Sequence, residues 1–219
     1  SLEIAFGPAD VEPGAIPALL EGAAIAWIDH TALPTDVAAR CTGLTDVVFL
    51  GTGARSYMDP EALAELGIAV HLIKGYGDTA VAEHTIALLF AAARELAAMD
   101  RAMRAGTWLR REGVQLAGRT LGLVGFGGIA AEVARIARAI GMRVVAWNRT
   151  PRLAAGVEFV AIERLLADSD AVSLHLLLND ETRGFLSRAR IAAMRPGAIL
   201  VNTARGALVD EDAMVEALR

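Results

Sequence analysis

The amino-acid sequence predicts an α/β protein of two domains, each built on a parallel β-sheet with helices packed on its faces. Three observations lead to this fold class. Short apolar runs alternate with helical patterns along all 219 residues, and such alternation is typical of parallel sheets. A long alanine-rich segment near the middle separates two such series. The second series opens with a glycine-rich turn between a strand and a helix.

The first series carries short strands joined by short helices. The strands are expected at residues 2–6, 24–28, 47–50 and 68–73. The clearest helix follows Asp59 and Pro60, because an aspartate accepts hydrogen bonds from free N-terminal amides and proline suits the first helical turn. Gly67 is expected to end that helix.

One long helix is predicted over residues 81–104. Its apolar face is expected to contain Val81, Thr85, Leu88, Ala92 and Leu96, at spacings of three and four. A helix of this length suits a bridge between two domains, so we place the domain boundary near residue 98. The first domain is then 1–97 and the second 98–219. A core helix within a single domain is the alternative interpretation.

The second series repeats the alternation of strand and helix. Strands are expected at residues 120–124, 144–147, 171–177 and 198–202. Helices are expected at 129–140, 162–166, 187–194 and from Asp210 onwards, the last still running at Arg219. Ser187 and Asp210 are the expected N-caps, and Gly141 is expected to end the first of these helices.

Composition excludes several classes of function. A net charge of −5 argues against nucleic acid as the main partner. No apolar run is long enough to cross a bilayer, so no membrane is expected as a partner. The one cysteine, Cys41, permits neither an internal disulfide nor a thiolate metal cluster. This usage and the lack of a recognisable signal peptide predict a cytoplasmic protein. No histidine spacing suggests a metal.

The strongest local motif is Gly-Phe-Gly-Gly-Ile-Ala at 125–130, which matches the G-x-G-x-x-G/A pattern of a Rossmann dinucleotide site. Gly125 permits the tight turn, and Gly127 lets the backbone approach a pyrophosphate. Gly128 and Ile129 begin a helix whose free N–H groups attract phosphates. A plain glycine turn between strand and helix is the competing interpretation.

The end of the next strand should select between NAD and NADP. Asn148 lies eighteen residues beyond Ala130, where an acidic residue would bind the ribose hydroxyls of NAD. Asn148 is uncharged and is followed by Arg149 and Thr150, which could hold a 2′-phosphate through charge-assisted hydrogen bonds. The sequence therefore favours NADP(H). NAD remains the alternative if the arginines are only surface charges.

Five segments, in this order, resemble the D-isomer-specific 2-hydroxyacid dehydrogenase family. They are VAEHT at 81–85, RAGTW at 104–108, the run 118–127, SLHLLLNDET at 173–182 and VNTARGALVDE at 201–211. The resemblance implies a flavodoxin-like substrate domain followed by a Rossmann nucleotide-binding domain. It also implies a homodimer, and hydride transfer between NAD(P)(H) and a small 2-keto or D-2-hydroxy acid.

The resemblance also implies roles for particular residues. Arg205 matches the family's catalytic arginine, and a guanidinium can grip a carboxylate bidentately and polarise the adjacent keto oxygen. Thr52 and Gly53 match a loop whose backbone N–H groups would hold the substrate carboxylate. The residues expected to line the dinucleotide by resemblance are Ile73, Leu176, Thr203, Ala204 and Arg205.

The chain departs from the family pattern in three ways. Gly128 stands where the family usually has Arg or Lys, and Leu177 replaces a common proline. The family's acid/base histidine and its glutamate partner are expected beyond Arg219. We therefore expect a chain truncated at its C-terminus and, since it starts without Met, at its N-terminus as well. On its own it is expected to be inactive.

The four histidines offer no clear substitute for that acid/base. His71 and His175 lie in apolar strands and are expected to be core residues, and His30 is expected in a turn. His84 heads the long helix near the expected cleft, where a structural role is favoured over contact with substrate.

Two other functions stay open. One is a non-catalytic dinucleotide-binding sensor, similar to a co-repressor. The other is a different two-domain NAD enzyme, such as an amino-acid dehydrogenase. The Asn-Thr-Ala-Arg-Gly segment at 202–206 argues against the second, and so does the single lysine, Lys74.

Overall fold

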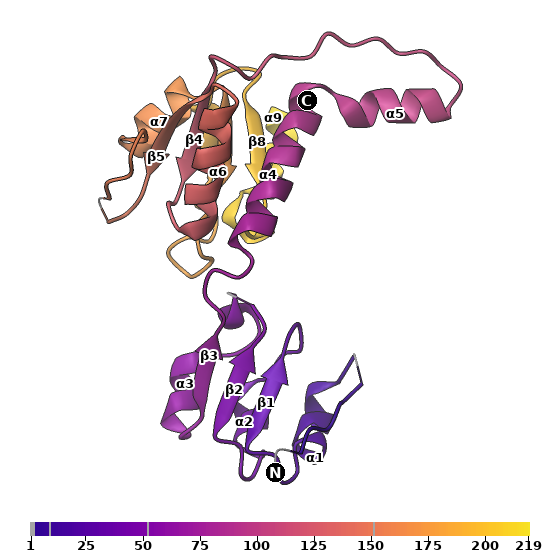
Figure 1. The fold of residues 1–219 in the computed structure, drawn as a ribbon, viewed down its shortest axis with the longest axis vertical. Helices are drawn as coiled ribbons and strands as arrows, with labels where there is room; N and C mark the ends of the chain where they lie inside the picture. Colours follow the sequence, from indigo (N-terminus) through magenta and orange to yellow (C-terminus); the bar gives the residue numbers. More distant parts are fainter. Residues whose placement is uncertain (1–2, 9, 52, 151) are drawn as a thin grey trace. The chain divides into compact units, whose positions relative to one another are not determined.

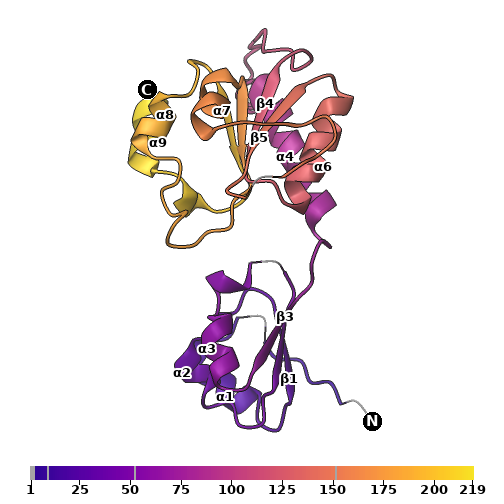
Figure 2. The same ribbon diagram turned by 90° about the vertical axis from the view of Figure 1, so that its left-hand side faces the viewer.

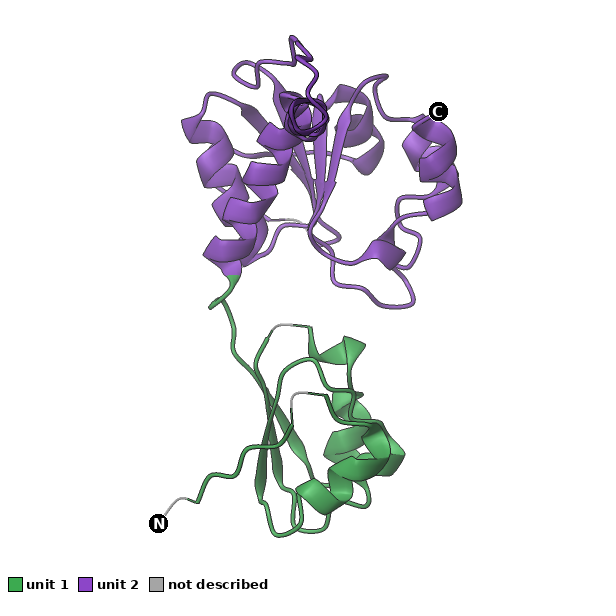
Figure 3. Ribbon diagram, turned by 90° about the vertical axis from the view of Figure 1, so that its right-hand side faces the viewer, with its two compact units in different colours: residues 1–77 green, residues 78–219 purple. Residues whose placement is uncertain are grey.

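The computed structural model describes residues 3–8, 10–51, 53–150 and 152–219. The chain divides into two compact units, residues 1–77 and 78–219 (Figure 3). Each unit contains one parallel sheet in its described residues, which confirms the predicted α/β class.

The first unit is built on three parallel strands in the order β1-β2-β3. The strands are β1 (Ile25–Ile28), β2 (Asp46–Phe49) and β3 (Ala69–Leu72). The short helices are η1 (Pro13–Ala15), α1 (Ile16–Leu19), α2 (Thr35–Ala38), η2 (Ala54–Ser56) and α3 (Pro60–Glu65). Figure 2 shows α1, α2 and α3 on one side of this sheet. Leu33, Val47 and Leu63 are fully buried in the core of this unit.

The residue pattern of strand β1 shows why the helices cover one face of this sheet and not the other. Ala26 and Ile28 point into the core, whereas Ile25 and Trp27 alternate with them and are exposed, Trp27 by 69%. Helix α3 begins as predicted, because Asp59 Oδ1 accepts hydrogen bonds from the backbone N–H groups of Glu61 and Ala62, both at 3.1 Å.

The predicted strand at 2–6 is wrong for the residues described. Residues 3–8 form no strand, and Phe6 is 94% exposed. Apolar alternation alone does not make a strand, since the backbone must also find a neighbouring strand to bond. In the described residues, this segment pairs with neither edge of the three-stranded sheet.

The second unit contains a five-stranded parallel sheet in the order β6-β5-β4-β7-β8. The strands are β4 (Thr120–Val124), β5 (Arg143–Trp147), β6 (Glu158–Phe159), β7 (Ala171–Leu174) and β8 (Ile199–Asn202). The helices are α4 (Asp78–Ala93), α5 (Leu96–Arg104), α6 (Gly128–Ala139), α7 (Ile162–Asp168), α8 (Arg188–Ala192), η3 (Gly206–Leu208) and α9 (Glu211–Ala217). The predicted strands match within three residues, and only β6 was not predicted.

Helices cover both faces of this sheet. Helices α4 and α6 pack against each other on one face, and α7, α8 and α9 lie on the other (Figures 1 and 2). All five residues of the central strand β4 are buried. The chain leaves β4 toward β5 and later crosses to β7 on the opposite side. The strand order therefore reverses at β4, which is where doubly wound sheets bind ligands.

The long helix predicted over 81–104 is two helices. Glu95 has φ 51° and separates α4 from α5. Of the five residues predicted for its apolar face, only Thr85 is buried, whereas Leu88 and Leu96 are exposed. The buried face instead combines Ala82 and Ala93 with Ile86 and Leu89, where α4 packs on α6 and β8.

The units divide after Gly77 and not near residue 98, because α4 belongs to the second unit. It packs on α6 and β8, and Thr85 Oγ1 lies 2.8 Å from Thr203 Oγ1 in a hydrogen bond. In the described ranges, no helix has the length and apolarity needed to span a membrane.

Candidate dinucleotide-binding site

Four of the residues predicted to bind the cofactor follow four parallel strands. Gly125 follows β4, Asn148 follows β5, Leu176 comes shortly after β7 and Thr203 follows β8. Parallel strands present their carboxyl ends at one edge, so segments far apart in the sequence meet there. The second unit thus gathers most of the predicted site at the position where doubly wound folds hold a ligand.

Gly125 is required by both conformation and space. It has φ +88°, and a Cβ atom there would lie 2.8 Å from the backbone oxygen of His175. Its N–H donates to the oxygen of Trp147 at 2.8 Å. The turn after β4 is therefore held against the ends of both neighbouring strands.

Gly127 leaves open space at the start of helix α6. It is the N-cap residue of α6, with an extended backbone and no side chain to accept from the first N–H groups. A Cβ added there would meet nothing within 4 Å. Ala130 is fully buried, so helix α6 packs closely at this point. An uncapped helix start beside open space suits a pyrophosphate, so these residues fit a dinucleotide.

Asn148 ties the end of β5 to the glycine loop. Its Oδ1 accepts from the N–H of Phe126 at 3.2 Å, and its Nδ2 donates to the backbone oxygen of Thr150 at 2.7 Å. An aspartate could accept the first hydrogen bond but could not donate the second. The structure thus gives Asn148 a positioning task that sequence reasoning missed.

Arg149 forms an ion pair with Glu181, 32 residues further along the chain. Both side chains are largely exposed. Glu181 was not among the predicted site residues, and no local pattern points to it. A 2′-phosphate that bound to Arg149 would have to replace or share this carboxylate.

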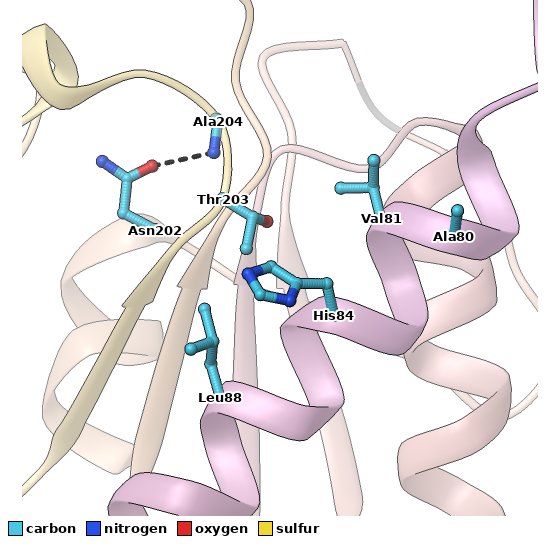
Figure 4. Close-up of a pocket in the computed structure, with 7 residues that line it drawn as sticks. All are labelled: Ala80, Val81, His84, Leu88, Asn202, Thr203 and Ala204. Carbon is cyan, nitrogen blue, oxygen red and sulfur yellow. Dashed lines mark hydrogen bonds between the residues drawn. The ribbon is translucent and has the colours of Figure 1, made fainter. Parts of the chain in front are cut away.

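An open pocket of about 500 Å³ lies between α4 and the loop after β8. Its lining residues are Ala80, Val81, His84, Leu88, Asn202, Thr203 and Ala204. Figure 4 shows the His84 ring pointing toward Thr203. His84 is exposed within this pocket, beside two residues predicted to line the dinucleotide.

Asn202 fixes the shape of the loop that carries Arg205. Its Oδ1 accepts from the N–H of Ala204 at 3.0 Å, and its Nδ2 donates to the oxygen of Arg205 at 2.8 Å. Arg205 is exposed, and its Nη1 donates to the oxygen of Ala204 at 2.8 Å. The loop therefore presents a guanidinium at the same sheet edge as the glycine turn.

The remaining predicted site residues belong to the first unit. Gly53 is the N-cap of η2, and Ile73 follows β3 and is exposed. Thr52 lies outside the described residues. The substrate-carboxylate loop therefore stays a prediction.

Of the two histidines expected in the core, only one is partly buried in the structure. His71 is exposed and not a core residue, because β3 is an edge strand with an open face, and its Nε2 lies 2.7 Å from Asp46 Oδ1. This partner lowers the pKa of Asp46. His175 is partly buried as expected, with its Nε2 2.9 Å from Ser173 Oγ. Burial lowers the pKa of His175 to about 4, so the ring is neutral near pH 7.

The strand order and the glycine turn together define a dinucleotide-binding domain of the doubly wound class. The sequence model of the D-isomer specific 2-hydroxyacid dehydrogenase NAD binding domain matches residues 86–219. The chain therefore belongs to the D-isomer-specific 2-hydroxyacid dehydrogenase family, and its second unit contains the family's NAD-binding domain.

Curated relatives agree with this assignment. A glyoxylate reductase of Aeropyrum pernix is 41% identical over 74% of this chain and 52% of its own length. A hydroxypyruvate reductase of Thermotoga maritima is 36% identical over 85% of this chain and 61% of its own length. The chain thus spans between half and two thirds of the length of these relatives.

Solved structures show the same fold. An acyclic imino acid reductase in complex with NADPH and D-Arg aligns with a TM-score of 0.89 and 31% identity, covering 95% of this chain and 68% of that one. A glyoxylate reductase from Paecilomyes thermophila aligns with a TM-score of 0.83 and 34% identity, covering 89% of this chain and 63% of that one.

Proposed function

We propose that the protein transfers a hydride between a nicotinamide dinucleotide and a small 2-keto or D-2-hydroxy acid. The observation that carries this proposal is the meeting of two loops at one edge of the second sheet. The loop after β4 offers an uncapped helix start for phosphates, and the loop after β8 offers the Arg205 guanidinium for a carboxylate. The membership of the family and the names of the relatives support the same reaction.

Each end of the site has a distinct task. The N–H groups of Gly127, Gly128 and Ile129 bind the pyrophosphate, while Gly125 lets the turn lie close to β7. The bound dinucleotide supplies or accepts the hydride. The residues proposed to line its nicotinamide half are Ile73, Leu176, Thr203, Ala204 and Arg205.

Arg205 binds the substrate carboxylate and polarises the adjacent keto oxygen. Backbone N–H groups of Thr52 and Gly53 are proposed as a second anchor for that carboxylate. His175 does not suit the proton transfer, because burial lowers its pKa to about 4 and its Nε2 is hydrogen-bonded to Ser173. The resemblance implies an acid/base histidine with a glutamate partner, and we propose neither role for a described residue of this chain.

NADP(H) is proposed as the preferred coenzyme. Arg149 and Thr150 follow the strand where a ribose would lie, and Asn148 brings no negative charge to repel a 2′-phosphate. A reductase of this fold is described in complex with NADPH, which supports the proposal. NAD is the alternative, and it is favoured if Glu181 keeps Arg149 engaged.

A homodimer is proposed through the second unit. Helix α5 buries none of its residues, and the apolar side chains of Leu96, Met103 and Trp108 are exposed. Exposed apolar side chains in one segment favour contact with another protein surface. Light scattering of the full-length protein tests this, and a monomer at micromolar concentration contradicts it.

The reaction is tested with the full-length protein and glyoxylate or hydroxypyruvate as the first substrates. Arg205→Ala should lower kcat/KM at least about 100-fold, the cost of losing a charged contact to the reacting group, while the dinucleotide Kd changes little. Arg110→Ala is the matched control, since Arg110 is another exposed arginine outside the site. Dinucleotide binding without turnover of any 2-keto acid would favour the sensor instead.

A further inference from the structure

The carboxylate of Asp78 lies against the first residue of helix α6. Asp78 begins α4, and α4 packs beside α6 (Figure 1). A Cβ atom at Gly128 would lie 1.8 Å from Asp78 Oδ2 and 2.7 Å from its Cγ. The acidic group therefore fills the space that any side chain at position 128 would occupy.

This carboxylate has a favourable electrostatic position. It is partly buried and lies at the N-terminal ends of two helices, α4 with 16 residues and α6 with 12. The positive ends of helix dipoles stabilise negative charge. In the described part of the chain, Asp78 forms no salt bridge and no side-chain hydrogen bond. Its charge is thus neutralised by no cation.

The same end of α6 is the proposed site of the pyrophosphate. Two anions, one fixed and one bound, would then share one helix N-terminus. Unit charges a few ångströms apart at a protein surface repel each other strongly enough to change affinity several-fold. The fixed anion is present in every molecule, so it opposes each binding event.

We propose that Asp78 sets the affinity for the dinucleotide by competing electrostatically with its pyrophosphate at the start of α6. Gly128 is part of this arrangement, because a Cβ atom at this position would force the carboxylate of Asp78 to move. The protein therefore binds its coenzyme less tightly than the glycine loop alone would allow, and releases it faster. This inference rests on the proposed dinucleotide site.

The test compares Asp78→Asn with the full-length wild type, using NADH and NADPH in fluorescence titrations. Asparagine keeps the shape of the side chain and removes its charge. Both Kd values should fall about five- to tenfold in low salt. The ratio of wild-type to variant Kd should shrink toward one at 0.5 M salt, because the repulsion is screened at about that ionic strength. Glu83→Gln, at an exposed position of the same helix, should leave both Kd values unchanged.

A second pair of variants tests the role of Gly128. Gly128→Ala should destabilise the wild type, since the new Cβ atom would clash with Asp78. The same change should cost much less stability in an Asp78→Ala background. Additive costs would overturn this steric coupling.

The outcomes separate the two proposals. If Asp78→Asn leaves the Kd unchanged or raises it, competition is excluded and the carboxylate is either neutral toward the coenzyme or a contact for it. If the wild type binds neither dinucleotide, the proposed site itself fails.

Discussion

The two ends of the dinucleotide site are fixed by different means. At the pyrophosphate end, Gly125 is held by backbone contacts with Trp147 and His175. At the proposed adenosine end, Arg149 is held by one exposed carboxylate, that of Glu181. Backbone sterics leave a single arrangement, whereas an exposed ion pair can exchange partners at little cost. The comparison teaches that the fold fixes the shape of the glycine turn, while the proposed choice between coenzymes rests on a few exposed side chains.

The largest effect is expected at Gly125. Gly125→Ala adds both a strained positive φ and a contact of 2.8 Å with the His175 oxygen. It should destabilise the unit by about 2–4 kcal/mol and abolish dinucleotide binding. Urea unfolding measures the first effect and fluorescence titration the second.

Gly118→Ala is the matched control for this change. Gly118 has φ +80°, but a Cβ atom there meets nothing within 4 Å. Gly118→Ala should lower the free energy of unfolding by only about 1 kcal/mol, because the positive φ is its one source of strain. Equal losses in the two variants would show that the close approach to β7 contributes nothing.

His175, whose backbone borders Gly125, should make stability depend on pH. Its pKa of about 4 in the folded protein lies below the ordinary value of 6.5. The unfolded chain therefore binds more protons between these values, so stability is full above about pH 6.5 and falls as the pH drops toward 4. The loss between pH 7 and pH 5 should be about 2 kcal/mol.

Urea unfolding of wild type and His175→Gln at both pH values checks this effect. Glutamine can keep a hydrogen bond to Ser173 without titrating. The variant should lose about 2 kcal/mol less than wild type on acidification. His30→Gln serves as the control, because His30 is exposed. Equal losses in His175→Gln and wild type would contradict the assignment.

Asn148 connects the two ends, so its loss should be of intermediate size. Asn148→Ala removes two hydrogen bonds that position the glycine loop. It should raise the Kd for NADH and NADPH by similar factors, about five- to tenfold, because each neutral hydrogen bond contributes about 1 kcal/mol. A change confined to one coenzyme would make Asn148 a reader of the ribose and not a positioning residue.

The smallest effect is expected at Glu181. Glu181→Gln releases Arg149 and should lower the Kd for NADPH about threefold while leaving that for NADH unchanged, since an exposed pair contributes less than about 1 kcal/mol. Competition titrations of the two coenzymes measure the ratio. If both values move together, Arg149 does not discriminate between them.

The sequence predicted features that depend on local residues and missed features that depend on tertiary packing. Strand β4, the glycine turn and the Asp59 cap were predicted correctly because each depends on residues that are neighbours in the chain. The exposure of His71 and the break at Glu95 were missed, because they depend on packing and on which sheet face is covered.

The site shows the same limit. Arg149 and Gly128 were predicted as site residues from local motifs. The tertiary contacts of these residues were not predicted. Glu181 is paired with Arg149 only through tertiary structure, and Asp78 meets Gly128 only where two helices pack. Sequence motifs thus located the candidate site, whereas the neighbours proposed to set its affinity are visible only in the tertiary structure.

The hydroxyl pair of Thr85 and Thr203 has one further consequence. Thr85 is almost completely buried, and the 2.8 Å bond joins two uncharged groups. Neither salt nor mild acid changes such a bond, although salt weakens exposed ion pairs such as that of Arg149 with Glu181. Helix α4 and the loop after β8 should therefore keep their mutual register under conditions that reset the charges of the site. The backbone amides next to this pair can therefore serve as a fixed reference when local motion is measured by amide hydrogen exchange.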